Sequence, residues 1–335
     1  MIRSVLILSA FAVASSAWAQ RHMEVGVSSG VTHYYGDLGN IDGPVQWNSA
    51  RPGMTVAFRD FLNNKKRYVT RSVTTEARLS WFRIGYDETA PIKDKEVQDL
   101  KNYKRGLSFR NDLVGASGHL VLNAYREPFT PLFQQRFFMY FHIGLGVYHG
   151  RPKADLFRGD QDLANKYYFW EDGTVRDAPR RTPNANVVER DGKYETDLYS
   201  WLTEGGAGAG DATRTQRFSP WHVGVPMGAG LRVMATRKWS VGLEYCYLMF
   251  LTDMLDDVSD RYATYDEIDA TYDSAVDQDL ARYISDPTGW GTAGEVDVRA
   301  SPRGNPALLD SFSFFSLEVS YKFKRSPMRR SYMSL

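Results

Sequence analysis

Residues 315–323 read FSLEVSYKF and alternate apolar with polar side chains without a break. The apolar members are Phe315, Leu317, Val319, Tyr321 and Phe323, and the polar members are Ser316, Glu318, Ser320 and Lys322. Because successive side chains of a β-strand point to opposite faces, this pattern predicts a strand with one apolar side and one polar side. Such a strand is typical of a membrane barrel, which meets lipid outside and encloses a polar lumen.

Seven other segments alternate in the same way, which brings the predicted strands to eight. They are residues 24–35, 54–61, 68–85, 107–125, 137–147, 223–233 and 239–250. The connections 62–67, 126–134 and 236–238 are short, whereas 36–51, 86–106, 150–220 and 251–310 are long. Short and long connections alternate, as in outer-membrane barrels with short periplasmic turns and long outer loops. A secreted β-sandwich has no reason to segregate loop length in this way.

The sequence therefore predicts an all-β fold, an eight-stranded antiparallel transmembrane β-barrel with long extracellular loops. The same alternation of loop lengths predicts that both termini lie in the periplasm. Residues 1–20 read MIRSVLILSAFAVASSAWAQ, with Arg3, an apolar run and the small-x-small site Ala17-Trp18-Ala19. This start predicts a signal peptide over 1–19, followed by a barrel over 20–325 and a basic periplasmic tail over 326–335.

The composition of the chain excludes several classes of protein. The sequence has no run of 18 or more apolar residues, which excludes a transmembrane helix. One cysteine, Cys246, cannot form an internal disulfide. The net charge of +1 gives no reason to expect nucleic acid as a partner. Aromatic residues make up 14% of the chain, which fits the aromatic girdles of a membrane barrel.

Catalytic motifs are missing from the sequence. It contains no HExxH, Walker A, GxSxG or EF-hand pattern. Residues 115–119, GASGH, bring Ser117 close to His119, but they lack the spacing of a nucleophile elbow and lie in a predicted strand. We therefore expect a protein that is not an enzyme, with no cofactor, no metal and no small-molecule substrate.

Charged residues fall on the predicted inward face of the barrel. They are Glu24, Arg59, Glu76, Arg78, Arg232, Glu244 and Glu318. The interior of an eight-stranded barrel is narrow enough for side chains to fill it. Opposite charges are expected to pair across it, which favours a plugged lumen over a conducting pore.

The long connection 251–310 is strongly acidic, with 14 Asp and Glu against four Arg. Carboxylates at this density could hold Ca²⁺, but their spacing matches no known calcium loop. The pattern favours a solvated or helix-capping segment, with a short helix within 262–284 over the barrel mouth.

The predicted periplasmic edge is basic instead. Its candidate partner-binding residues are Lys65, Lys66, Arg67, Arg237, Lys238, Arg325, Arg329 and Arg330. Such a rim can contact anionic lipid headgroups or dock a complementary periplasmic protein. The sequence leaves both readings open.

Several stretches resemble one family. Residues 24–38 end in YYGDL, 107–110 read LSFR, 144–154 read GLGVYHGRPKA, 252–259 read TDMLDDVS, and RGNP at 303–306 precedes a strand ending in YKF. In this order they resemble the PorG-like outer-membrane β-barrels of the Bacteroidota, which include a component of the type IX secretion system.

The resemblance implies an outer-membrane component that tethers periplasmic ring subunits of that system, with outer-membrane lipid around it. It marks as rim residues Gly36, Asp37, Thr252, Asp253, Asp256, Asp257 and Ser259. The chain departs from the simpler pattern in its long 150–220 connection, its long acidic loop and its basic tail. Two alternatives remain: a scaffold whose outer loops bind a ligand or surface partner, and a small channel.

Overall fold

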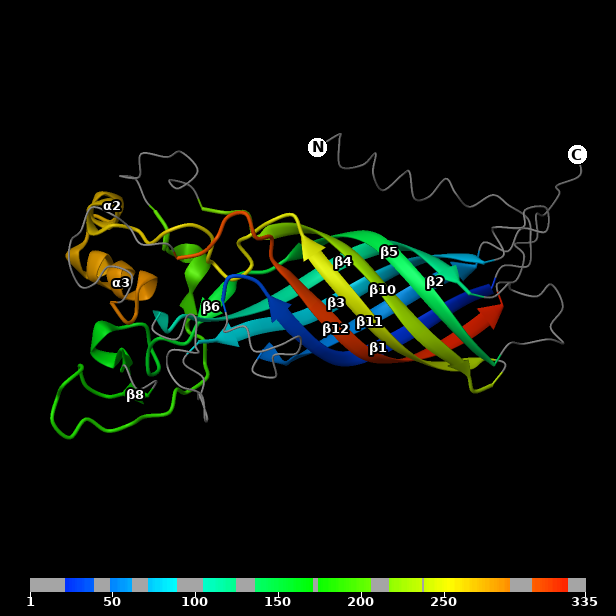
Figure 1. Cartoon of the computed structure of the whole chain (residues 1–335), viewed down its shortest axis with the longest axis horizontal. Coiled ribbons are helices and arrows are strands. Elements are labelled where there is room, and N and C mark those ends of the chain that lie inside the picture. Colours follow the sequence, from blue (N-terminus) through cyan, green and yellow to red (C-terminus); the bar gives the residue numbers. More distant parts are fainter. Residues whose placement is uncertain are drawn as a thin grey trace, which may run out of the picture.

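The structure is a computed structural model that describes residues 22–38, 49–61, 72–88, 105–124, 136–170, 174–205, 217–236, 238–289 and 303–324. Eight long strands form the body of the molecule. They are β1 (His22–Tyr35), β2 (Arg51–Phe61), β3 (Val73–Asp87), β4 (Ser108–Asn123), β5 (Phe137–His149), β10 (Trp221–Met234), β11 (Trp239–Phe250) and β12 (Ser311–Lys324). They pair antiparallel in the order β3-β2-β1-β12-β11-β10-β5-β4, and β3 also pairs with β4. The sheet therefore closes, and the predicted eight-stranded barrel is confirmed (Figure 1).

The outer wall of the barrel is apolar. Leu145, Leu243 and Leu317 are 60%, 45% and 52% exposed. The residues on either side of each leucine in its strand face inward and are glycine, serine or glutamate. A barrel dissolved in water would carry the opposite pattern. An apolar band of this kind is stable when lipid covers it.

Aromatic residues gather at both ends of the strands. At the end with short turns, the rings of Trp239 and Tyr321 are 4.9 Å apart. At the end with long loops, His149 contacts Trp221 at 4.8 Å. Such belts are typical of the two membrane–water interfaces of an outer-membrane barrel.

Several strands extend beyond their predicted limits at the long-loop end. Residues 51–53, 86–87, 148–149, 221–222 and 311–314 belong to strands, although the predicted strands did not include them and residues 51 and 86–87 were assigned to loops. The reason is a change in what fills the lumen. Phe312 and Phe314 are buried and point inward, on the same face as Glu318. Inward aromatic residues next to the outward Phe315 interrupt the apolar–polar alternation from which the prediction started.

The long connections build a folded cap beyond that end of the barrel (Figure 1). Its elements are β6 (Pro152–Ala154), η5 (Leu163–Asn165), β7 (Tyr168–Phe169), β8 (Val175–Arg176), β9 (Thr196–Asp197), η6 (Leu198–Ser200), α2 (Tyr265–Thr271) and α3 (Ala275–Ser285). Strand β6 pairs with β4, and β9 pairs with β6, so the barrel wall continues into the cap. The single helix predicted within 262–284 is a pair of helices. No helix of the described residues is long and apolar enough to cross a membrane.

One apolar core runs from the barrel into the cap. It joins the lumen rings of Phe82, Tyr148, Phe250 and Phe312 to cap residues that include Phe157 and Ile284. The rings of Phe250 and Phe312 stack at 5.7 Å, and that of Tyr148 meets Phe250 edge-on at 5.4 Å. The cap is therefore packed against the barrel, and the long-loop end of the lumen is closed by side chains.

The outward apolar face makes a direct test possible. Leu243→Arg would place a charge against lipid in the middle of β11 and should destabilise the barrel by about 2–4 kcal/mol. Val276→Arg is the control, because Val276 is 63% exposed on helix α3 of the cap. The measurement is urea-dependent folding into lipid vesicles, followed by the faster gel migration of unheated barrel. Equal losses in the two variants would contradict the assignment of a lipid-facing wall.

Candidate functional site

The middle of the lumen is filled by charged side chains from six strands. All seven predicted inward residues are buried. The strand register brings opposite charges together: Arg59 of β2 lies directly across from Glu24 of β1 and from Glu76 of β3. Gly26 leaves room beside them, since a Cβ there would lie 3.0 Å from the Arg59 guanidinium.

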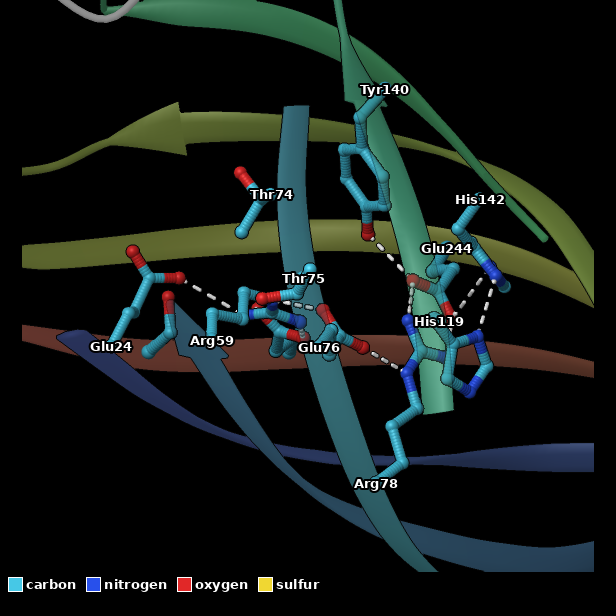
Figure 2. Close-up of polar contacts among 12 residues, drawn as sticks. Glu24, Arg59, Thr74, Thr75, Glu76, Arg78, His119, Tyr140, His142 and Glu244 are labelled. Atoms are coloured by element: carbon cyan, nitrogen blue, oxygen red, sulfur yellow. Dashed lines mark hydrogen bonds and ion pairs between the residues drawn. The ribbon is translucent and has the colours of Figure 1, made fainter. Parts of the chain in front are cut away.

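Arg59 is the centre of this network (Figure 2). Its Nη1 atom donates to Glu24 at 3.0 Å and to Glu318 at 2.7 Å, and its Nε atom donates to Glu76. Arg232 donates to Glu318 at 3.2 Å from another side of the barrel. One guanidinium therefore holds carboxylates from three different strands.

Arg78 organises the neighbouring half of the lumen. It donates to Glu76 and binds both oxygens of Glu244, with Nη2 at 2.8 Å from Oε2. The Tyr140 hydroxyl donates to the same Glu244 oxygen at 2.8 Å (Figure 2). Buried charges are tolerated when each one is paired and hydrogen-bonded. The seven residues meet that condition together, and they leave the lumen filled at this level.

His142, Glu244 and Cys246 place three potential metal ligands within 4.8 Å of one another. The Glu244 carboxylate is already bound by Arg78 and Tyr140, so a guanidinium occupies the place of a cation. Ser117 and His119 do form a hydrogen bond of 2.8 Å. The other ring nitrogen of His119 meets His142 at 3.2 Å, whereas a catalytic triad requires a carboxylate there. Both groups are part of the lumen wall.

The second cluster lies at the long-loop end, where the family-motif residues meet. We call it the rim cluster: Tyr34, Gly36, Asp37, Thr203, Glu204, Thr252, Asp253, Asp256, Asp257, Ser259, Arg303, Gly304 and Asp310. The seven motif residues expected at the rim all belong to it, although they come from two distant segments, residues 36–37 and 252–259.

The Tyr34 hydroxyl joins two of these carboxylates. It donates to Asp256 and, at 3.2 Å, to Asp310, whose other oxygen accepts from the Leu255 amide at 2.8 Å. Gly36 has to be glycine here, because a Cβ would lie 2.0 Å from the Tyr34 hydroxyl and 2.2 Å from the Asp310 carboxylate.

Arg303 joins the other side of the rim cluster. It donates to the Asp257 carbonyl and lies 3.1 Å from the Glu204 carboxylate, while Thr203 donates to the Asp257 side chain at 2.7 Å. The Asn305 amide donates to Asp37 at 2.7 Å. Gly304 permits this approach, because a Cβ there would lie 2.5 Å from Asp37. The motifs around residues 36, 256 and 304 therefore form one hydrogen-bonded unit.

The expectation of a solvated acidic segment is wrong for both ends of this loop. Asp253, Asp256, Asp257 and Asp310 are buried. Their partners are far away in sequence, with Tyr34 separated from Asp256 by 222 residues. Leu255 and Val258 lie between these aspartates in the sequence and are both buried. These apolar residues were the feature of the sequence that could have indicated a buried segment.

The helix-capping part of that expectation is confirmed. Glu267 and Thr264 form a capping box at the start of α2, and Asp266 also lies in its first turn. The described residues contain two groups of three close metal-ligand atoms, and neither group includes an acid of the 251–310 loop.

Burial changes the protonation of the rim carboxylates. It raises the pKa of Asp253 to about 8, aided by Asp37 and Asp256 and opposed by the nearby Ser259 hydroxyl. Burial also raises the pKa of Asp256 and of Asp257, where Tyr34 and Arg303 respectively oppose it. These carboxyls are therefore protonated more readily in the folded cap than in an unfolded chain.

The predicted basic rim is represented by one described residue. Lys238 is exposed, and its Nζ atom lies 5.8 Å from the centre of the Tyr321 ring. The other candidates, Lys65, Lys66, Arg67, Arg237, Arg325, Arg329 and Arg330, lie outside the described residues.

Comparisons with known proteins bear on the fold alone. No protein-family model and no curated protein matches the chain. Among solved structures, Ail, the attachment invasion locus protein of Yersinia pestis, is similar at 9% identity over 91% of this chain and 100% of its own, with a TM-score of 0.34. Neisserial surface protein A matches at 7% identity over 92% and 100%, with a TM-score of 0.30. A major outer membrane protein from Thermus thermophilus matches at 8% over 90% and 99%, with a TM-score of 0.33. Because these TM-scores are all below 0.5, the barrel assignment rests on the closed pairing of the chain's own strands.

The lumen network predicts a large effect for its central arginine. Arg59→Met removes one of the arginine partners of three buried glutamates and should cost about 3–5 kcal/mol of barrel stability. Arg83→Met is the matched control, because the Arg83–Asp112 pair at 2.7 Å is partly exposed and should contribute less than about 1 kcal/mol. Urea unfolding in detergent measures both. A loss for Arg59→Met no greater than the control would contradict a network centred on Arg59.

The rim cluster predicts a pH dependence of the cap. A carboxyl with a pKa that is higher in the folded state than in the unfolded state destabilises the folded state as it loses its proton. This loss of stability develops between the pKa of the unfolded chain, about 4, and the pKa in the folded protein, which for Asp253 is about 8. Asp253→Asn mimics the protonated form, so hydrogen-exchange protection of residues 251–289 should exceed that of the unaltered protein at pH 8. This difference in protection between the two proteins should shrink towards pH 5. Because the two proteins are compared at equal pH, the intrinsic exchange rate cancels.

Asp160→Asn, at an exposed position elsewhere in the cap, is the control and should not alter protection at either pH. A gap of the same size at pH 5 and pH 8 would show that the charge of Asp253 is not its cause.

Proposed function

We propose that this chain is a non-enzymatic outer-membrane barrel that serves as a structural component of the type IX protein secretion system. In that role it holds the periplasmic ring subunits of the system at the membrane. The observation that carries the proposal is the meeting of the family-like motifs in the rim cluster. Residues that resemble the PorG-like family in sequence order, among them Gly36, Asp257 and Gly304, contact one another directly or through shared partners.

The filled lumen supports a structural role. Arg59, Arg78 and Arg232 are paired with glutamates across the barrel, and aromatic side chains occupy its long-loop end. Opening a pore would require breaking several buried ion pairs at once, which is costly. An anchor needs no such opening.

The proposed orientation puts the short turns and both termini in the periplasm and the cap outside the cell. The basic residues at the short-turn end, with Lys238 exposed among them, would then face both anionic lipid and the ring subunits. Charge complementarity to an acidic surface of a ring subunit is the interaction we propose for them.

The experiment is co-purification from solubilised outer membranes. Reversing the charge of the basic edge with Lys65→Glu, Lys66→Glu, Arg67→Glu and Lys238→Glu should reduce recovery of ring subunits at least about tenfold, since each lost pairing weakens docking. Arg261→Glu, an exposed arginine in the cap, is the matched control. Undiminished recovery with the reversed edge, or normal cargo export after deletion of the gene, would overturn the proposal.

A second function is favoured by a pocket in the cap. It has a volume of about 380 Å³ and is lined by residues that include Trp201, Arg217, Phe218, Asp260 and Pro306. Aromatic walls with a few charged groups are typical of ligand sites. If the outer loops bind a ligand or surface partner, trimming residues 150–220 should abolish that binding while cargo export continues.

A further inference from the structure

Three carboxylates gather in the cap, away from the rim cluster and the lumen. Asp155 directly follows β6, and Asp191 and Glu195 precede β9. Pairing of Ala154 with Thr196 aligns the two segments and brings Asp155 next to Glu195. One oxygen from each of the three carboxylates lies within 4.8 Å of the other two.

Backbone and hydroxyl donors hold one side of the carboxylates of Asp155, which is buried, and Glu195, which is half-buried. Glu195 Oε1 accepts from the amides of Leu156 and Phe157, both at 2.9 Å, and from the Thr196 hydroxyl at 2.9 Å. Asp155 Oδ2 accepts from the Gly192 amide at 2.8 Å. The orientation of both groups is therefore determined by the loop itself.

The other oxygen of each of these two carboxylates has no such donor. Asp155 Oδ1 and Glu195 Oε2 are buried, and neither has a hydrogen-bond partner among the residues that the structure describes. Asp155 is only 3% exposed. A buried acceptor without a partner is unfavourable, and more so when it is charged. Two of them in one cluster therefore call for a positively charged or protonated species near them.

Asp191 forms the open side of the group. It is exposed, and its oxygens accept from the amides of Lys193 and Gly159, both at 3.1 Å. Gly159 has a φ of +88° and Gly192 a φ of +69°, in the left-handed region that favours glycine. These turns direct backbone amides at the carboxylates and leave solvent access from one side.

The neighbouring cations do not fill the space. The ammonium of Lys193 lies 3.2 Å from Asp191, but its side chain is 65% exposed. The guanidinium of Arg190 is directed to Asp87 and to the Ser108 hydroxyl, the latter at 3.1 Å. Neither donates a hydrogen bond to the free oxygens of Asp155 or Glu195.

We propose that Asp155, Asp191 and Glu195 bind a divalent cation, and that the ion is Ca²⁺. The ligands are oxygens alone, which suits a hard cation, and Ca²⁺ accepts irregular carboxylate geometry with water completing its shell. Mg²⁺ requires a near-octahedral set and gives up its water reluctantly. Bound Ca²⁺ would tie residues 155–159 to 191–195 and stiffen the cap. The proposal does not depend on type IX secretion.

Protonation is the competing explanation. Burial raises the pKa of Asp155 to about 6, opposed by Arg190 and aided by Glu195 and Asp191. A proton on Asp155 could then bridge to Glu195 without any metal. The two explanations differ in one measurable respect, which is whether a cation binds at neutral pH.

The experiment uses the full chain, folded in detergent, with Tb³⁺ as a luminescent probe for the Ca²⁺ site. The Tyr167 hydroxyl accepts from the Asp191 amide at 3.0 Å, so tyrosine excitation should sensitise a Tb³⁺ ion held by this group. Ca²⁺ should displace the signal with a Kd of about 10⁻⁴–10⁻³ M, the range of extracellular calcium modules. Mg²⁺ should displace it at least about tenfold less well.

The variants locate the ion. Asp155→Asn combined with Glu195→Gln should weaken displaceable Tb³⁺ binding at least about tenfold, and Asp191→Asn alone, at an exposed position, should weaken it without disturbing the buried loop. Glu189→Gln, an exposed neighbour in the same loop, is the matched control and should bind normally. Faster gel migration of unheated samples verifies that each variant barrel is folded.

A second readout is limited proteolysis of the loop. Ca²⁺ should slow cleavage within residues 152–197 in the unaltered protein and in Glu189→Gln, and should not do so in the double variant. Absence of a Ca²⁺-displaceable signal up to about 10 mM, well above the expected Kd, would leave the proton as the explanation and overturn the proposal. An unchanged affinity in the double variant would overturn it as well, because the ion would then bind elsewhere.

Discussion

The pairing of Arg59 with Glu24, Glu76 and Glu318 is the interaction on which the barrel depends. An eight-stranded barrel encloses a space only as wide as its side chains, and that space is shielded from water at this level. Charges placed there have to neutralise one another. The direct register of Arg59 with Glu24 and Glu76 means that strand alignment and charge pairing impose the same arrangement. A shift by one residue would turn these charges towards lipid.

The folding of the cap depends on the side chains that line the long-loop end of the barrel. Inward side chains change from charged in the middle of the lumen to aromatic at the long-loop end, and Phe250 and Phe312 continue the apolar core into the cap. The loops can therefore fold on an apolar base instead of remaining solvated. Burial on that base in turn requires partners for the acidic residues, which Tyr34, Thr203 and Arg303 supply in the rim cluster. Asp155 and Glu195 lack such partners on one side, and this difference distinguishes a structural cluster from a candidate binding site.

Local patterns in the sequence predicted the strands and the inward charges well. Arg59, Arg78 and Arg232 could be assigned to the lumen because a side-chain period of two allows few other registers. The predicted strand 315–323 stopped short where the side-chain period continued but the chemistry changed, at Phe312 and Phe314, which point inward although they are apolar. The prediction of a solvated segment was wrong for Asp253 and Asp256, which are buried. The sequence did not predict the cluster of Asp155, Asp191 and Glu195, because Asp155 meets the other two, 36 and 40 positions further along the chain, only through the pairing of β6 with β9.

The sequence by itself determined the number of strands, the face of the residues in each alternating stretch, and the alternation of short and long connections. These properties depend on neighbours along the chain and on the difference between lipid and a polar lumen. Tertiary structure alone decided which charges pair, that the acidic rim is buried, and that Asp155 and Glu195, each with one oxygen that accepts no hydrogen bond, lie in one cluster. Those outcomes depend on contacts between distant segments, such as Tyr34 with Asp256, and barrel closure is what brings such segments together.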